Sequence, residues 1–262
     1  METTSLPALF LSHGSPMLAL EDSPAGRFLD GLGTALPRPR AIVVASAHYM
    51  TPAPAVGAAA APATVHDFGG FPAPLYALQY PAPGEPGLAA EVAARLDAAG
   101  LATTVQPTHG LDHGVWVPLR RMYPQADIPV VPLSVNPLAD AAAHFALGQA
   151  LAGLRAEGVL VIGSGGFVHN LGDLDWQHRD VPLAPWAAAF SSWMHEKLAS
   201  HDWAALLDWQ AQAPHARHAH PTTEHLMPLF VALGAGGTDP EVEVLHRSHE
   251  LGTLALDAFA FR

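Results

Sequence analysis

Histidine is the residue type most able to do chemistry in this chain, which has 16 histidines and no cysteine. Three of them follow short apolar runs: His13 in SHGSP follows LPALFL, His48 in SAHYM follows AIVVAS, and His169 in GSGGFVHNL follows GVLVI. Neutral imidazole is the commonest transition-metal ligand, and its pKa near neutrality also suits proton transfer. One such histidine is more often a solvated or capping residue, but their recurrence after apolar runs predicts a metal centre.

The segments that must position these histidines alternate between short apolar runs and longer helical patterns, which is typical of an α/β fold. We expect one domain, 1–262, with a mainly parallel or mixed central sheet flanked by helices on both faces. The expected strands are 8–11, 41–46, 102–106, 129–135, 158–164, an alternating strand 241–248, and an edge strand within 253–261. The expected helices are 23–34, 87–99, 114–122, 138–156, 185–199, 201–211 and 222–233.

Ligands of open α/β sheets bind beyond the carboxyl ends of the strands. Four of the five buried strands are followed there by a histidine; the third leads into PTHGLDHG, with His109 and His113, and the fifth into His169 and Asn170. These loops should converge on one imidazole cluster. The Pro-rich segment 52–86 is a long excursion without an expected element, and such loops are usually functional.

A further group of candidates lies in the segment HARHAHPTTEHLMPL, residues 215–229. Pro221 suits the first turn of a helix, with His220 near its cap. Residues five apart on a regular helix point about 140° apart, so His220 and His225 should not both face one metal. Glu224 and His225 differ by about 100°, so again one is expected to be a ligand.

Composition excludes several other classes of function. The chain carries 12 Lys and Arg against 24 Asp and Glu, so a nucleic-acid backbone would be repelled. The absence of cysteine excludes disulfides and thiolate metal sites. No stretch approaches the ~18 apolar residues of a membrane span, no signal peptide is apparent, and we expect a cytoplasmic location. The G-x-S-x-G, phosphate-loop and H-E-x-x-H patterns are missing.

Six motifs in order, SHGSP, SAHY, DFGGFP, LDHGVWVPL, GSGGFVHNL and HPTTEHLMPL, resemble the class III extradiol ring-cleavage dioxygenases. They are most similar to the DODA-type branch, the 4,5-DOPA-extradiol-dioxygenase-like proteins. The resemblance extends from residue 8 to about residue 260. It implies a single α/β domain with a metal at the strand ends, and an enzyme that opens a small-molecule catechol with O2.

The resemblance also implies roles for individual residues. His13 and His48 match two metal ligands, and His225 is the expected third, with Glu224 as the alternative. His169 matches the catalytic acid/base. The remaining expectations are a catalytic role beside the substrate for His113, substrate binding for His220 and Asn170, and support of the His13 ring by Ser12 or Ser15.

The implied cofactor is one divalent metal, with Fe²⁺ needed for activity and Zn²⁺ expected in the isolated protein. Zinc is d¹⁰ and cannot activate O2 by redox chemistry, so its presence would not identify the reaction. Two other functions stay open at this point. The same histidines could form a zinc hydrolase, or the chain could be a non-enzymatic binding protein of the same fold. Tyr49, where many relatives carry Trp, leaves the identity of the catechol open, and the oligomeric state is also open.

Overall fold

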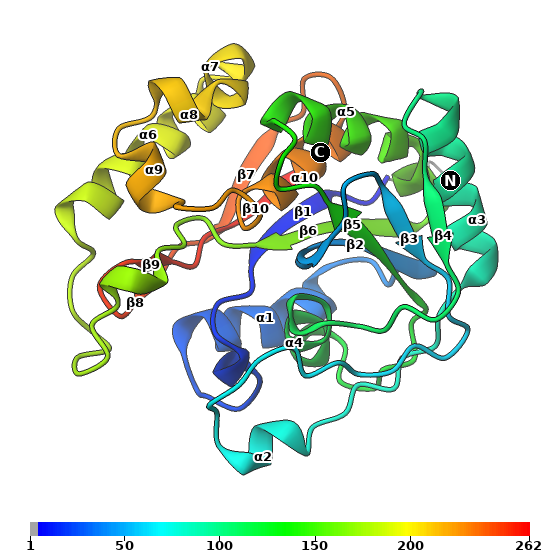
Figure 1. Ribbon diagram of the computed structural model, residues 1–262, viewed down its shortest axis with the longest axis horizontal. Coiled ribbons are helices and arrows are strands. Elements are labelled where there is room, and N and C mark those ends of the chain that lie inside the picture. Colours follow the sequence, from blue (N-terminus) through cyan, green and yellow to red (C-terminus); the bar gives the residue numbers. More distant parts are fainter. Residues whose placement is uncertain (1–4) are drawn as a thin grey trace.

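The computed structural model describes residues 5–262. Eight strands of this region form one central sheet (Figure 1). Their order in space is β4-β3-β5-β2-β6-β1-β10-β7, and β8 and β9 form a separate small pair. The strands are β1 (Ala8–Ser12), β2 (Ala41–Met50), β3 (Ala55–Gly57), β4 (Thr104–Gln106), β5 (Val130–Val135), β6 (Val159–Gly165), β7 (Val242–His246), β8 (His249–Glu250), β9 (Leu254–Ala255) and β10 (Ala258–Phe261).

The four inner strands β5, β2, β6 and β1 run parallel, whereas β3 is antiparallel to β5 and β10 is antiparallel to β1. Every residue of β1, β5 and β6 is buried. Their continuous apolar sequences match strands that are covered on both faces. The predicted α/β domain with a mixed sheet is therefore confirmed.

Helices cover both faces of this sheet (Figure 1). One face packs against α1 (Pro24–Ala35), α4 (His113–Met122) and the 3₁₀ helix η1 (Pro16–Ala19), and the other against α3 (Pro86–Ala98), α5 (Ala141–Leu151), α6 (Pro185–Ala199) and α10 (Met227–Gly236). The shorter helices are α2 (Ala73–Tyr76), η2 (Ala152–Glu157), η3 (Leu171–Asp173), α7 (Trp203–Leu207), α8 (Trp209–Gln212) and α9 (Ala216–Ala219). None of the helices in residues 5–262 combines the length and apolar character needed to cross a bilayer.

The structure differs from the sequence-based expectations in three segments. Segment 52–86 is not structureless, because it contains β3 and α2. The strand near the C-terminus is not at an edge, since β10 lies between β1 and β7. The late helix starts at Met227, with Pro228 rather than Pro221 in its first turn, so His220 and His225 precede it and the helical-angle argument does not apply to them.

The predicted convergence of strand ends also fails for the third expected strand. β4 is parallel to β3, and β3 is antiparallel to β5. The end of β4 therefore points away from the edge at which β1, β2 and β6 end. His113 reaches that edge by another route, because it is the first residue of α4. Asp112 caps the N-terminus of this helix, and its side chain accepts a hydrogen bond from the amide of Val115.

Candidate active site

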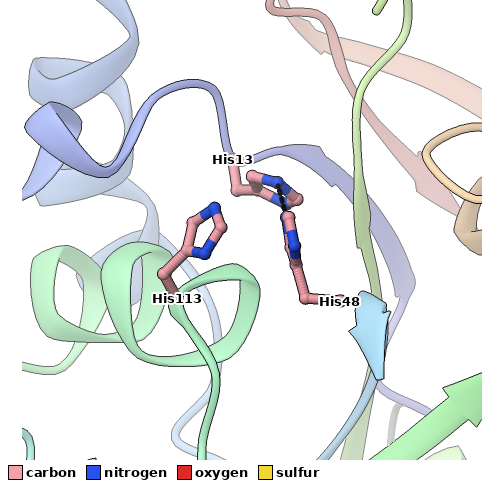
Figure 2. Close-up of side chains that lie close together, drawn as sticks. All are labelled: His13, His48 and His113. Atoms are coloured by element: carbon pink, nitrogen blue, oxygen red, sulfur yellow. Dashed lines mark hydrogen bonds between the residues drawn. The ribbon is translucent and has the colours of Figure 1, made fainter. Parts of the chain in front are cut away.

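Three imidazole rings meet at the carboxyl ends of the inner strands (Figure 2). His13 follows β1, His48 lies near the end of β2, and His113 begins α4. One ring nitrogen of each lies within 4.8 Å of a ring nitrogen of the other two. The Nε2 atoms of His13 and His48 are only 3.0 Å apart. The structure thus brings three of the expected residues into one group.

Two further imidazoles extend this group. The rings of His169 and His225 are stacked, with centroids 3.4 Å apart and planes inclined by 7°. The His225 ring lies 4.9 Å from that of His48 and 5.5 Å from that of His13. Its Nε2 atom is buried and has no hydrogen-bond partner within the described region. His225 therefore presents a free nitrogen beside the group formed by His13, His48 and His113.

Glycine allows two of these segments to come close enough. Gly14 adopts a φ of +60°, as expected for a sharp turn directly after His13. At Gly165, a Cβ atom would lie 2.1 Å from the carbonyl oxygen of His225. That same oxygen accepts a hydrogen bond of 2.8 Å from the amide of Gly166. The GSGG sequence thus lets the segment before α10 lie directly against β6, which places His225 at the strand ends.

The hydrogen bonds of the site fix which nitrogen of His13 carries the proton. Ser164 Oγ donates to the carbonyl of Gly114, so it must accept from the Nδ1 of His13, which lies 3.0 Å away. The Nε2 of His13 then carries no proton, and its lone pair faces the Nε2 of His48. The hydroxyls of Ser12 and Ser15 have other hydrogen-bond partners, the carbonyl of Asp257 and the amide of Met17, so neither holds this ring as expected. The supporting hydroxyl comes instead from the end of β6.

Carboxylates lie beside the Nδ1 atoms of three other imidazoles, those of His48, His113 and His225. Asp67 Oδ1 accepts from the backbone amide of His113 at 2.9 Å and from its Nδ1 at 3.0 Å, and Asp67 Oδ2 lies 3.5 Å from the Nδ1 of His48. Glu224 Oε1 accepts from the Nδ1 of His225 at 3.0 Å and from the hydroxyl of Thr222. Such carboxylate–imidazole pairs direct Nε2 toward a metal. Sequence reasoning did not assign Asp67, although its motif DFGGFP lies in the segment expected to be functional.

Burial keeps the imidazoles of His13, His48, His169 and His225 neutral. Removal from water, followed by the proximity of the other imidazoles, lowers the pKa of His13 and of His225 well below the usual value. Burial also lowers the pKa of His48 to about 3 and that of His169 to about 4. At neutral pH each ring therefore offers a lone pair, as metal binding requires.

The donor set fits a metal ion. The Nε2 atoms of His13 and His48 lie 3.0 Å apart, so they share a hydrogen bond if the Nε2 of His48 carries the ring proton, and both can bind one cation if it does not. Two nitrogens bound to one metal at about 2.1 Å are separated by roughly 3 Å, which agrees with this distance. The free Nε2 of His225 needs a partner as well, because an unpaired buried polar atom costs about 1–3 kcal/mol.

The imidazoles separate two cavities. One, called here the apolar cavity, has a volume of about 230 Å³ and is lined by all five site histidines together with Phe68, Phe71 and several leucines. The second, called the side cavity, has a volume of about 570 Å³ and is lined by His48, His169 and His225 together with Glu224 and Asn170.

Two expected substrate-binding residues occupy supporting positions. His220 is buried outside both cavities, and its Nε2 lies 3.1 Å from the carbonyl oxygen of Phe167. Asn170 lines the side cavity, but its side chain accepts from the amide of Gly172 and donates to the carbonyl of His218. Hence the structure does not bring His220 to the cavities, and the Asn170 amide is already used to hold the loop.

His109, which was expected at the same sheet edge, is also outside the imidazole group. Its ring stacks on that of Tyr49, with centroids 3.5 Å apart. The reversed direction of β4 accounts for this position, because the chain passes His109 before it turns back to the site.

Comparison with known proteins supports the same chemistry. The sequence profile of the family described as "Catalytic LigB subunit of aromatic ring-opening dioxygenase" matches residues 7–256. A protein of Beta vulgaris named 4,5-DOPA dioxygenase extradiol is 42% identical over 96% of this chain and 95% of the relative. A protein of the same name from Escherichia coli K12 is 42% identical over 98% of this chain and 94% of the relative.

A solved structure extends the similarity to three dimensions. The crystal structure of an uncharacterized protein from Escherichia coli K12 superposes with a TM-score of 0.83 at 36% identity, covering 98% of this chain and all of that one. A dioxygenase from Hapsidospora irregularis is 36% identical over 90% of this chain and 80% of its own length. The chain belongs to the LigB family and is a metal-dependent, extradiol-type aromatic ring-opening dioxygenase that uses O2 on a small aromatic substrate.

Proposed function

We propose that this enzyme opens the ring of a substituted catechol, with Fe²⁺ held by His13, His48 and His225. The observation that carries the proposal is the pair of His13 and His48 Nε2 atoms, 3.0 Å apart, together with the unpartnered Nε2 of His225, all in residues that line the apolar cavity. When bound, Fe²⁺ supplies the redox chemistry that activates O2, which d¹⁰ Zn²⁺ does not. Zn²⁺ is expected to occupy the same ligands in protein that is purified in air.

His225 is favoured over two other candidates for the third ligand. Glu224 is less suitable because its carboxylate already accepts from His225 and Thr222. His113 belongs to the tight group of ring nitrogens, but the Nε2 of His225 is the buried atom that has no partner in the described structure. Metal binding would remove that cost, and His113 would then be left to face the substrate.

His169 and His113 are proposed to handle protons and to orient the catechol. His169 is neutral because burial lowers its pKa to about 4, so it can accept a proton from a catechol hydroxyl and return it later in the reaction. Its stacking on His225 holds the ring at the cavity wall. The Nδ1–H of His113 is held by Asp67, which leaves Nε2 to accept a hydrogen bond from a substrate hydroxyl.

The relatives named above are called dioxygenases, and no contact in the described structure favours a hydrolase or a binding protein over ring cleavage. Oxygen uptake tests the proposal. Protein stripped of metal and reloaded anaerobically with Fe²⁺ should consume O2 stoichiometrically with a catechol and form a yellow semialdehyde. Zn²⁺-loaded protein is the control and should consume none. No uptake by the iron-loaded enzyme with any catechol would refute the proposal.

Variants assign the roles. His169→Ala should keep one metal per chain but lose cleavage by at least about 10²-fold, since proton transfer contributes that much or more. His225→Ala should lose the metal, whereas His113→Ala should retain it and lose turnover. Metal analysis of the purified variants separates these cases. Retained metal in His225→Ala together with lost metal in His113→Ala would assign the third ligand to His113 instead.

A further inference from the structure

The wall of the apolar cavity beyond the imidazoles carries almost no polar side chains. Apart from the five site histidines and Ser15, every lining residue is apolar or glycine. Ser15 Oγ already accepts from the amide of Met17. The large apolar side chains of this wall include Phe68, Phe71, Leu174, Trp176, Leu254 and Leu256.

No lysine or arginine within residues 5–262 lines either the apolar cavity or the side cavity. Of the three arginines within four residues of a cavity-lining residue, Arg217 is exposed and lines neither cavity, and the other two are already paired. Arg179 binds the carboxylates of Glu21 and Glu250, and Arg247 faces the buried carboxylate of Asp257 at 3.8 Å. The side cavity contributes a carboxylate of its own, that of Glu224. A substrate carboxylate would thus enter without a cationic partner, and burial of an unpaired charge is unfavourable.

The apolar lining continues outward to the surface. Trp176 is 73% exposed and Leu171 is 57% exposed, and both line the apolar cavity. Large apolar side chains that are exposed together beside a cavity mark a ligand-binding surface. A group attached to a catechol whose hydroxyls face the histidines would leave the ring along this surface.

We propose that the substrate of this enzyme is a catechol that carries an uncharged, apolar substituent, such as an alkyl or aryl group, rather than an amino acid or a carboxylate. This inference rests on the proposed catechol cleavage and specifies its substrate class. The catechol hydroxyls contact the imidazoles, and the substituent packs between Phe68, Leu254 and Trp176.

A substrate series tests the inference with the Fe²⁺-loaded enzyme. We would measure kcat/KM for catechol, 4-methylcatechol, 4-butylcatechol, protocatechuate and DOPA by oxygen uptake. Burial of each added methylene is expected to raise kcat/KM roughly three- to fourfold, until the wall is covered. Protocatechuate and DOPA should fall at least about tenfold below 4-butylcatechol, because their charges find no partner.

Two variants place the selectivity in this wall. Trp176→Ala should reduce the ratio of kcat/KM for 4-butylcatechol to that for catechol by about fivefold, since it removes apolar contact area. Leu171→Arg should raise kcat/KM for protocatechuate at least about fivefold relative to 4-butylcatechol, by supplying the missing cation. The matched control is Leu138→Arg, at a residue that is 92% exposed and lines neither cavity, and it should leave every ratio unchanged.

The outcomes separate the two proposals. Cleavage of no catechol at all would overturn the proposed function. Efficient cleavage with DOPA or protocatechuate equal to or better than 4-butylcatechol would leave ring cleavage in place and overturn the inference. Ratios that respond equally to Leu171→Arg and Leu138→Arg would also overturn it, because the selectivity would then not reside in the cavity wall.

Discussion

Asp67 supports two of the site imidazoles, so its replacement by asparagine tests how the metal centre is held. Burial opposes ionisation of this carboxyl, but the hydrogen bonds that it accepts from the ring and the amide of His113 outweigh that effect and lower the pKa of Asp67 to about 2. The group is therefore a carboxylate at neutral pH. In Asp67→Asn the amide oxygen can still accept from one ring, whereas the amide nitrogen would face the Nδ1–H of the other and repel it.

The size of the effect depends on which imidazoles bind the metal. Loss of one outer partner of a ligand typically weakens metal affinity 10- to 100-fold, or by about 1.4–2.7 kcal/mol. Asp67 contacts His48 at 3.5 Å but His113 at 3.0 Å, with a second bond to the His113 amide. If His48 is the only ligand that it supports, as proposed, we expect a loss of about tenfold; if His113 is also a ligand, the loss should approach 100-fold.

The assay is a competition titration of metal-free protein with Zn²⁺ against a chromogenic chelator at pH 7. The control is Asp22→Asn, at an exposed carboxylate that pairs with Arg27 and lines neither cavity. It should bind Zn²⁺ as the unaltered protein does, and circular dichroism should show that both variants are folded. If folded Asp67→Asn retains its Zn²⁺ affinity within twofold, the carboxylate does not organise the site and the reasoning is refuted.

Two other substitutions probe the packing that forms the site and the fold. Gly165→Ala would place a methyl group 2.1 Å from the carbonyl oxygen of His225. We expect at least about tenfold weaker Zn²⁺ binding in the same titration, and a lower melting temperature. An affinity and a melting temperature like those of the unaltered protein would contradict the close approach. The side chain of Arg155 donates hydrogen bonds to the carbonyls of Leu6, Ala235 and Gly236, and Arg155→Ala would remove all of them. We expect urea unfolding to show a free energy of unfolding lower by about 3 kcal/mol. A decrease below about 1 kcal/mol would show that water replaces these bonds.

Much of the architecture was predictable because the inner strands are marked by local sequence. β1, β2, β5 and β6 coincide with apolar runs, and parallel strands end at one edge, so the approach of His13, His48 and His169 follows from the order of elements alone. The direction of β4 was not predictable in this way, because a strand of three exposed residues carries no pattern that shows which neighbour it joins.

The rest of the site depends on contacts between segments that are distant in sequence. Nothing in the residues around Asp67 indicates that its carboxylate meets His48 and His113, since that contact depends on the path of segment 52–86 over the sheet. The start of the late helix was misplaced for a different reason. Pro221 and Pro228 are both suitable first-turn residues, and the apolar sequence after Met227, whose helix is buried all round, favours the second.

The imidazoles that meet at the strand ends come from segments near both ends of the chain, with His13 after the first strand and His225 before the last helix. No single hairpin or helix pair contains them, so an unfolded or half-folded chain offers no comparable site. Occupancy of the centre is therefore thermodynamically linked to folding of the entire sheet. A metal present at one hundred times its dissociation constant would add about 2.7 kcal/mol to the free energy of unfolding, and the loaded enzyme would be held together partly by the ion that it uses.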